Sequence, residues 1–335
     1  MSELMIPKDY RSAMSLHSTQ KAIGRLKRSF EDNLSAALNL SRVSAPLFVA
    51  PETGLNDNLN GVERPVEFDL AETGRNVQVV QSLAKWKRMA LHKYGFNPGE
   101  GIYTDMNAIR RDEVMDNLHS VYVDQWDWEK VIEKKDRNTD FIKDVVRKIV
   151  TAICDTTDEI RKIYPQITTL LSREVAFITT QELEDMYPGL KPKDREDCFL
   201  KKNPTAFIMK IGGKLKSGVK HDGRAPDYDD WELNGDIVFW NELLGCAFEV
   251  SSMGIRVDSK SLDKQLKEAD CDDRRGLDFH RMLLEDKLPL TIGGGIGQSR
   301  LSMLILQKAH IGEVQVSVWD DKTTSGCSAS GIELL

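Results

Sequence analysis

The chain of 335 residues has few aromatic residues, no C-x-x-C pair and no long apolar run. Its five cysteines are odd in number and scattered, which argues against a disulfide framework and against a zinc site. Nowhere do about 18 apolar residues follow one another, and the N-terminus has no apolar stretch of the signal-peptide kind. We therefore expect a cytoplasmic protein with reduced thiols that does not span a membrane.

A basic surface is also missing, because the formal net charge is −7 and the pI is near 5.5. Proteins that bind nucleic acid neutralise its phosphates with basic residues, so we expect no nucleic acid partner. The composition, 40% hydrophobic and 30% charged, is that of an ordinary soluble protein with enough material for a core. We find no internal repeat, low-complexity tract or linker, and we expect one domain over residues 1–335.

Apolar spacing predicts the elements of the fold. Helices are expected over 17–39, from Leu83 to Leu91, and over 141–163, 259–285 and 298–309. An extended segment is expected over 41–46, and strands over 74–80, 102–109, 121–129, 175–178, 206–211, 236–240 and 247–252. Strands outnumber the crossover helices that a parallel sheet needs, which favours an α+β fold, a mostly antiparallel sheet flanked by helices.

A glycine-rich run, Thr291-Ile-Gly-Gly-Gly-Ile-Gly-Gln-Ser-Arg300, precedes the last predicted helix. Glycines let backbone approach a bound group closely, and Arg300 falls where helix N-terminal N–H groups favour anions. The spacing fits neither a P-loop nor a G-x-G-x-x-G dinucleotide site. Taken alone, the run favours a glycine-rich turn carrying a solvent-facing arginine, and the upstream segments described below reverse that preference.

The predicted strand 121–129 places Gln125, Asp127 and Glu129 on one face. Val121 and Val123 share that face, so the row is expected to run from the core into a wet pocket. The polar loop before this strand holds Arg110 and Arg111, either of which could bind a phosphate or carboxylate in bidentate fashion.

Other charged residues allow two interpretations each. Asp236 and Glu249, at the ends of apolar strands, suit Mg²⁺ bound beside phosphate or a simple salt bridge. The stretch 221–231 is expected to be a loop in which crowded aspartates require a cation or donor. Asp57 lies in a segment, 54–61, that is equally natural as an Asx-rich turn. Lys85 and Lys87, in the first turns of a predicted helix, indicate an anionic ligand, and a solvated basic face is the competing interpretation for Lys85 and Arg88.

Five strings in order carry a resemblance: SLAKWKR (82–88), LHSVYVDQWDWE (118–129), RAPDYDDW (224–231), SSMGIRVD (251–258) and IGGGIGQSR (292–300). Their order is similar to the catalytic core of class II aminoacyl-tRNA synthetases of the aspartate and asparagine type. The strings themselves more closely resemble ammonia-dependent asparagine synthetases, the aspartate–ammonia ligases that share this core. The resemblance runs from about residue 17 to about 320.

The resemblance implies ATP-dependent synthesis of L-asparagine from L-aspartate and ammonia through β-aspartyl-AMP, with release of AMP and pyrophosphate. It implies that ATP is contacted by Arg110, Glu113, His119, Gln298 and Arg300. It implies that aspartate is contacted by Ser82, Lys87, Gln125, Asp127, Arg224 and Arg256. It assigns Mg²⁺ to Asp236 and Glu249, and ammonia to Asp57 and Asp229. The catalytic residues expected on this basis are Arg110, Arg300, Asp57 and Asp229, with Arg110 preferred over Arg111.

The same resemblance implies a homodimer, with the helix at 17–39 and Pro46 at its interface. The rival interpretation is an aspartyl- or asparaginyl-tRNA synthetase-like paralogue, catalytic or acting as a binding module. A synthetase is expected to add an anticodon-binding barrel and a basic surface, and a silent paralogue to lack Arg110, Glu249 or Arg300. The length, the charge and the presence of these residues favour the ligase.

Overall fold

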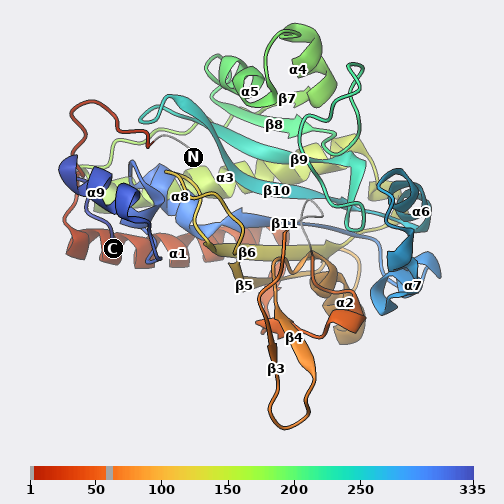
Figure 1. Cartoon of the computed structure of the whole chain (residues 1–335). Coiled ribbons are helices and arrows are strands. Elements are labelled where there is room, and N and C mark those ends of the chain that lie inside the picture. The colour runs from red at the N-terminus through yellow and green to blue at the C-terminus, as the bar shows by residue number, and fades with distance from the viewer. Residues whose placement is uncertain (1–3, 58–62) are drawn as a thin grey trace.

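The computed structural model describes residues 4–57 and 63–335 (Figure 1). Within them, eight strands form the main sheet in the order β1-β5-β6-β11-β10-β9-β8-β7. These strands are β1 (Leu40–Arg42), β5 (Gly101–Ile109), β6 (Tyr122–Val131), β11 (Thr291–Gly297), β10 (Cys246–Arg256), β9 (Asp229–Asn241), β8 (Thr205–Met209) and β7 (Ala176–Thr179). All neighbours pair antiparallel except β1 with β5 and β7 with β8. The expected α+β fold with a mostly antiparallel sheet is confirmed.

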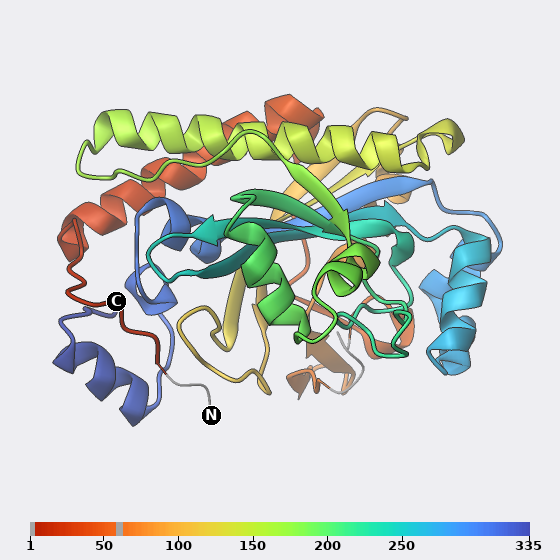
Figure 2. The ribbon, with the colours of Figure 1, turned by 90° about the horizontal axis from the view of Figure 1, so that it is seen from above.

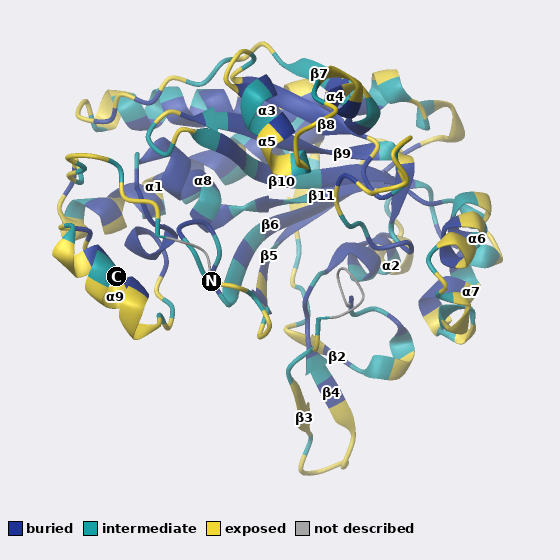
Figure 3. Cartoon of the chain, turned by 45° about the horizontal axis from the view of Figure 1, so that its top comes forward, coloured by how far each residue is buried: buried dark blue, intermediate teal, exposed yellow. Residues whose placement is uncertain are grey.

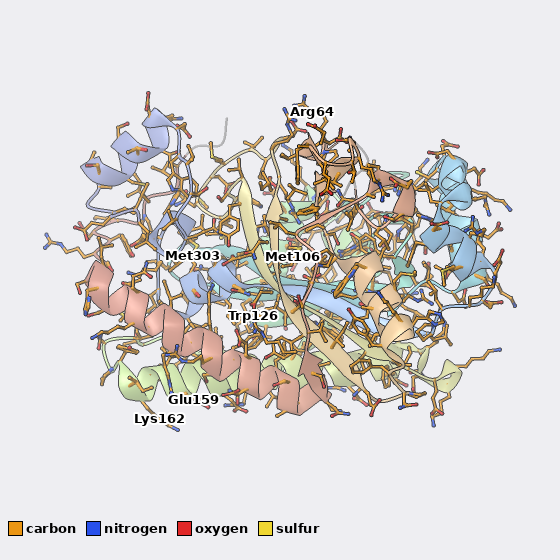
Figure 4. The ribbon with its side chains drawn as sticks, turned by 90° about the horizontal axis from the view of Figure 1, so that it is seen from below. Arg64, Met106, Trp126, Glu159, Lys162 and Met303 are labelled. Carbon is orange, nitrogen blue, oxygen red and sulfur yellow. The ribbon has the colours of Figure 1, made fainter. Side chains whose placement is uncertain are left out.

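Two long helices, α1 (Leu16–Leu38) and α3 (Thr139–Ile163), lie side by side on one face of this sheet (Figure 2). Phe30 of α1 packs on Trp126 of β6 with ring centroids 4.7 Å apart. Figure 4 labels Trp126 on the sheet beside α1, and Glu159 on α3. The Glu159 carboxylate accepts a 2.6 Å hydrogen bond from the Ser29 hydroxyl of α1. Because side chains alternate along a strand, the neighbours of Trp126 on β6 point to the opposite face.

Shorter helices surround the rest of the sheet: α2 (Ala84–Tyr94), α4 (Thr180–Met186), α5 (Pro192–Leu200), α6 (Ser259–Glu268), α7 (Asp278–Leu284), α8 (Gln298–Ile305) and α9 (Asp321–Ala329). Thr179 and Glu182 form the expected capping box at the start of α4. A small sheet of β2 (Phe48–Val49), β4 (Asn76–Val79) and β3 (Glu67–Asp69) projects from the body, and Figure 3 shows part of it exposed. Short 3₁₀ turns complete the fold: η1 (Pro51–Thr53), η2 (Lys134–Asp136), η3 (Asp272–Gly276) and η4 (Ile311–Glu313).

Two sequence-based predictions of elements were wrong, and one strand was not predicted. The helix expected over 259–285 is broken between α6 and α7, where Asp270 adopts a left-handed φ of 54° that ends the helical path. The stretch 221–231, expected to be a loop, already enters β9 at Asp229. The glycine run is strand β11 at the centre of the sheet, paired with β6 and β10, and only then does α8 begin.

In the described part of the chain, no helix is both long enough and apolar enough to cross a bilayer. The predicted segment 54–61 around Asp57 is described only up to Asp57, and residues 58–61 lie outside the described residues.

Candidate active site

A pocket of about 390 Å³ opens on the face of the sheet opposite α1 and α3. Its walls come from β6, β10 and β11, from the start of α2, from the loop after β5 and from the segment before β9. Twelve of the residues expected at the site line it: Ser82, Lys87, Arg110, Glu113, His119, Gln125, Asp127, Arg224, Asp229, Glu249, Arg256 and Arg300. The expectation that one face of β6 runs into a pocket is therefore confirmed for Gln125 and Asp127.

Three expected residues lie outside this wall. The Gln298 amide is buried and donates a 2.7 Å hydrogen bond to the Asp105 carboxylate of β5, so it joins α8 to β5 and does not point into the pocket. Asp236 lies behind Arg224, with a carboxylate oxygen 2.6 Å from the guanidinium. Asp57 is buried and does not line the pocket, but it lies near Tyr228, which does. Burial raises the pKa of the Tyr228 phenol, and the negative charge of Asp57 raises that pKa further.

At one end of the pocket two buried cations are held by acids. The Lys87 ammonium lies 2.9 Å from the Asp127 carboxylate and donates a 2.9 Å hydrogen bond to the Gly294 carbonyl. Arg256 donates to both oxygens of Glu129, at 2.7 to 3.1 Å, and also to Asp229. Burial lowers the pKa of Lys87, while Asp127 and Glu129 oppose that shift. Both cations are thus fixed in position before any substrate arrives.

Glu129 is the functional residue at this end that the sequence-based prediction left without a role. It is fully buried and accepts a further hydrogen bond from the Thr291 hydroxyl at 2.7 Å. Burial would raise its pKa, but Arg256 and Lys87 hold the pKa below its usual value. The available signal was that Glu129 shares a strand with two buried tryptophans, Trp126 and Trp128, and lies on the same strand face as Gln125 and Asp127.

A second buried charge cluster lies just outside the pocket and also was not assigned from the sequence. The Asp227 carboxylate is bound by Lys85 at 3.1 Å, Arg274 at 2.9 Å and His280 at 2.9 Å. Burial would raise the pKa of Asp227, but Lys85, the hydrogen bond with His280 and Arg274 hold the pKa well below its usual value. Lys85 shares α2 with Lys87, and Asp227 shares a segment with Asp229, so the cluster fixes one pocket wall to the other.

The other end of the pocket presents two arginines. Arg300, on α8 just after β11, donates a 3.0 Å hydrogen bond to the Glu249 carbonyl and lies 3.8 Å from its carboxylate. Arg110, in the loop between β5 and β6, lies 4.0 Å from Glu113. Arg111 is exposed and does not line the pocket. Two partly exposed guanidinium groups facing one cavity suit an anionic ligand with several oxygens.

Carboxylates near Arg224 provide a test of whether a divalent cation fits here. Burial and the neighbouring Glu249 raise the pKa of Asp236 to about 7 in spite of its ion pair with Arg224. Across residues 4–57 and 63–335, no three or more His, Cys, Asp or Glu side chains group in a way that could hold a metal ion. Mg²⁺ commonly takes only one or two protein carboxylates together with phosphate oxygens. Of the two carboxylates expected here, Glu249 lines the pocket, whereas Asp236 is paired with Arg224 behind the pocket wall.

Solved structures share this architecture. The asparaginyl-tRNA synthetase of Pyrococcus horikoshii, in complex with asparaginyl-adenylate, matches with a TM-score of 0.65 at 15% identity, over 90% of this chain and 68% of that one. The aspartyl-tRNA synthetase of Entamoeba histolytica matches with a TM-score of 0.61 at 19% identity, over 90% of this chain and 59% of that one. The fold is that of a class II aminoacyl-tRNA synthetase catalytic core.

Relatives found by sequence have a much higher sequence identity to this chain than these solved structures have. Aspartate–ammonia ligases of Clostridium tetani and Ruminiclostridium cellulolyticum are each 60% identical, over 99% and 100% of this chain and 98% and 100% of their own length. The family described as aspartate-ammonia ligase matches residues 17–331. The chain belongs to the aspartate–ammonia ligase family, whose members are carbon–nitrogen ligases.

Proposed function

We propose that this pocket makes L-asparagine from L-aspartate, ammonia and ATP through a β-aspartyl-AMP intermediate. The observation that carries the proposal is one cavity with a buried Lys87–Arg256 cation pair at one end and Arg110 with Arg300 at the other. Such a cavity suits a small dicarboxylate joined to a polyphosphate. The family membership and the fold of adenylate-forming synthetases support the same chemistry.

The orientation of aspartate follows from the reaction. Its β-carboxylate must reach the α-phosphate of ATP, so its α-carboxylate occupies the opposite end, against Lys87 and Arg256. The α-ammonium group then lies against Asp127, with Ser82 and Gln125 as further hydrogen-bond partners. Arg224, also in the wall, adds positive charge on the same side.

In the first step an oxygen of the β-carboxylate attacks the α-phosphorus, and the bond to pyrophosphate breaks. Arg110 and Arg300 stabilise the negative charge that builds up on the phosphate oxygens, while Glu113 and His119 contact the nucleotide. Fixed charges of this kind do not have to reorganise during the reaction, so they favour the transition state. Mg²⁺, held by Glu249 and Asp236, would supply further charge neutralisation to the phosphates.

In the second step the nitrogen of ammonia attacks the β-carbonyl carbon, and AMP leaves with the electron pair of the carbon–oxygen bond. One proton must leave the nitrogen, and Asp57 and Asp229 are the proposed groups that guide ammonium or accept this proton. The products are asparagine, AMP and pyrophosphate. We further propose a cytoplasmic homodimer that uses α1 and Pro46 at its interface.

The test is to incubate the protein with ATP, Mg²⁺, aspartate and ammonium, and to follow asparagine, AMP and pyrophosphate. Arg300→Ala and Arg110→Ala are expected to lower kcat by roughly 10² to 10³-fold with unchanged unfolding curves, because each removes a fixed charge at the phosphates. Arg111→Ala, beside Arg110 but outside the pocket wall, is the matched control and is expected to keep wild-type turnover. Aspartate or asparagine transferred to tRNA, with no free asparagine formed, would support the tRNA synthetase-like rival instead.

A further inference from the structure

The side chain of Gln81 lines the pocket but has no role in the chemistry above. It follows β4 and precedes Ser82, and it is fully buried. Neither its Oε1 nor its Nε2 atom has a hydrogen-bond partner among residues 4–57 and 63–335. An amide with both polar atoms buried and unpaired is unusual in a folded protein.

The backbone of Gln81 is held firmly, so this arrangement does not reflect a loose segment. Its N–H donates a 2.9 Å hydrogen bond to the Asn56 side-chain oxygen, and the Asn56 amide donates to the Val79 carbonyl at 3.2 Å. The side chain therefore starts from a fixed point and extends into the cavity. Leaving such a group unpaired costs free energy, which a bound ligand can recover.

The neighbouring groups indicate which ligand atom is needed. Lys87 and Arg256, the cations at this end, already donate to Asp127, Glu129, Asp229 and a backbone carbonyl. The acids themselves accept hydrogen bonds and cannot donate them when ionised. The Gln81 oxygen has no donor among the described residues, so it is available to accept a hydrogen bond from an N–H group of the substrate.

We infer that Gln81 binds a substrate nitrogen, with its side-chain oxygen accepting a hydrogen bond from an ammonium-type N–H group. This inference rests on the proposed function, which brings two such groups to this end of the pocket. One is the α-ammonium group of aspartate, and the other is free ammonia or ammonium. The chemistry of recognition is the same for both, and kinetics separates them.

The test replaces Gln81 with methionine, which is similar in size and lacks the amide. A hydrogen bond to a charged group is worth enough to change a KM by roughly 10- to 100-fold. We expect Gln81→Met to raise the KM for ammonium, or the KM for aspartate, by that factor, and to leave the KM for ATP unchanged. A rise for ammonium identifies the nucleophile as the ligand, and a rise for aspartate identifies the α-ammonium group. Gln81→Glu, which keeps an acceptor oxygen, is expected to retain more of the nitrogen affinity.

Stability distinguishes this role from a structural one. Asn234→Leu is the matched control, because the Asn234 amide is also buried but is paired with both the N–H and the C=O of Ile211, outside the pocket wall. The control should lower the urea midpoint and leave each KM unchanged, whereas Gln81→Met should keep or raise the midpoint. Unchanged KM values for both nitrogen substrates in Gln81→Met, with or without loss of stability, would overturn the inference. If the wild type makes no asparagine, the proposed function fails. The contact with the α-ammonium group can then still be tested by comparing how far aspartate raises the urea midpoint of the wild type and of Gln81→Met.

Discussion

Gly293 lies directly over the carboxylate that holds Arg256, and replacing it with alanine tests how the aspartate end of the pocket is built. It pairs with Glu129 across β11 and β6. A Cβ atom at Gly293 would lie 1.9 Å from Glu129 Oε2 and 2.7 Å from Arg256 Nη2. All three residues are buried, so the clash must be relieved by moving the Glu129 and Arg256 side chains against each other.

The size of the effect follows from these distances. Ordinary contact to a Cβ begins at 3.4 Å, so the Glu129 carboxylate must move by about 1.5 Å, the difference between 3.4 and 1.9 Å. Such a shift, added to the present Arg256–Glu129 distance of 2.7 Å, takes the pair beyond hydrogen-bond range. Breaking a buried ion pair costs about 3 to 5 kcal/mol, a large part of the ordinary 5 to 15 kcal/mol of stability.

The assay combines urea unfolding with aspartate-dependent exchange of pyrophosphate into ATP. We expect Gly293→Ala to lose about 3 kcal/mol or more in the free energy of unfolding and to raise the KM for aspartate more than the KM for ATP. Gly213→Ala is the control, since a Cβ there meets no heavy atom within 4 Å, and its stability is expected to change by less than about 1 kcal/mol. Wild-type stability and wild-type KM for aspartate in Gly293→Ala would refute the account of Glu129 as the group that holds Arg256.

Two further predictions concern buried charges. Asp227→Asn should destabilise the protein by about 3 to 5 kcal/mol, because Lys85 would keep a buried charge without its counterion. Asp263→Asn, which removes an exposed partner of Lys267, should cost less than about 1 kcal/mol in the same urea titration, and equal losses would contradict the distinction. Burial lowers the pKa of His310 from 6.5 to about 4, so the unfolded chain binds the proton first and stability falls as the pH drops from about 6.5 towards 4. Between pH 7 and 5 this amounts to about 2 kcal/mol, and His310→Asn should flatten that part of the stability profile.

Periodic apolar residues allowed most elements to be predicted, and the failures have local physical causes. The α1 and α3 helices carry clear amphipathic patterns, and β5 and β6 were placed as an antiparallel pair. Strand β11 was missed because its four glycines have low β propensity and no side-chain alternation to detect. Its partners on both sides supply the hydrogen bonds that hold it in the sheet. Local pattern cannot reveal such tertiary stabilisation.

Site residues could be predicted where a short stretch of sequence shows their charge. The prediction was incomplete for residues whose role depends on contacts between segments far apart in the sequence. Arg300 stands at the end of a recognisable string and Arg110 in a polar loop next to a predicted strand, and both line the pocket. Glu129 and Arg256 are 127 positions apart, so their contact exists only after β6, β11 and β10 align. Gln298 belongs to the same string as Arg300, but two residues along α8 correspond to a rotation of about 200°, which sends the two side chains in different directions.

Strand β11 runs between the two ends of the pocket, and its four glycines leave room above it for the side chains of β6. Opposite Gly293 stands Glu129, and a Cβ at Gly295 would lie 2.3 Å from the Gln125 side chain and 2.9 Å from that of Asp127. The side chains of Gln125, Asp127 and Glu129 on β6 therefore lie over the glycines of β11. Side chains on β11 would occupy the same space. The strand then continues into α8 and delivers Arg300 to the phosphate end. Under the proposed function, this one segment sets the distance between the aspartate site and the phosphate site, and that distance determines whether a carboxylate held at one end can reach a phosphorus atom held at the other.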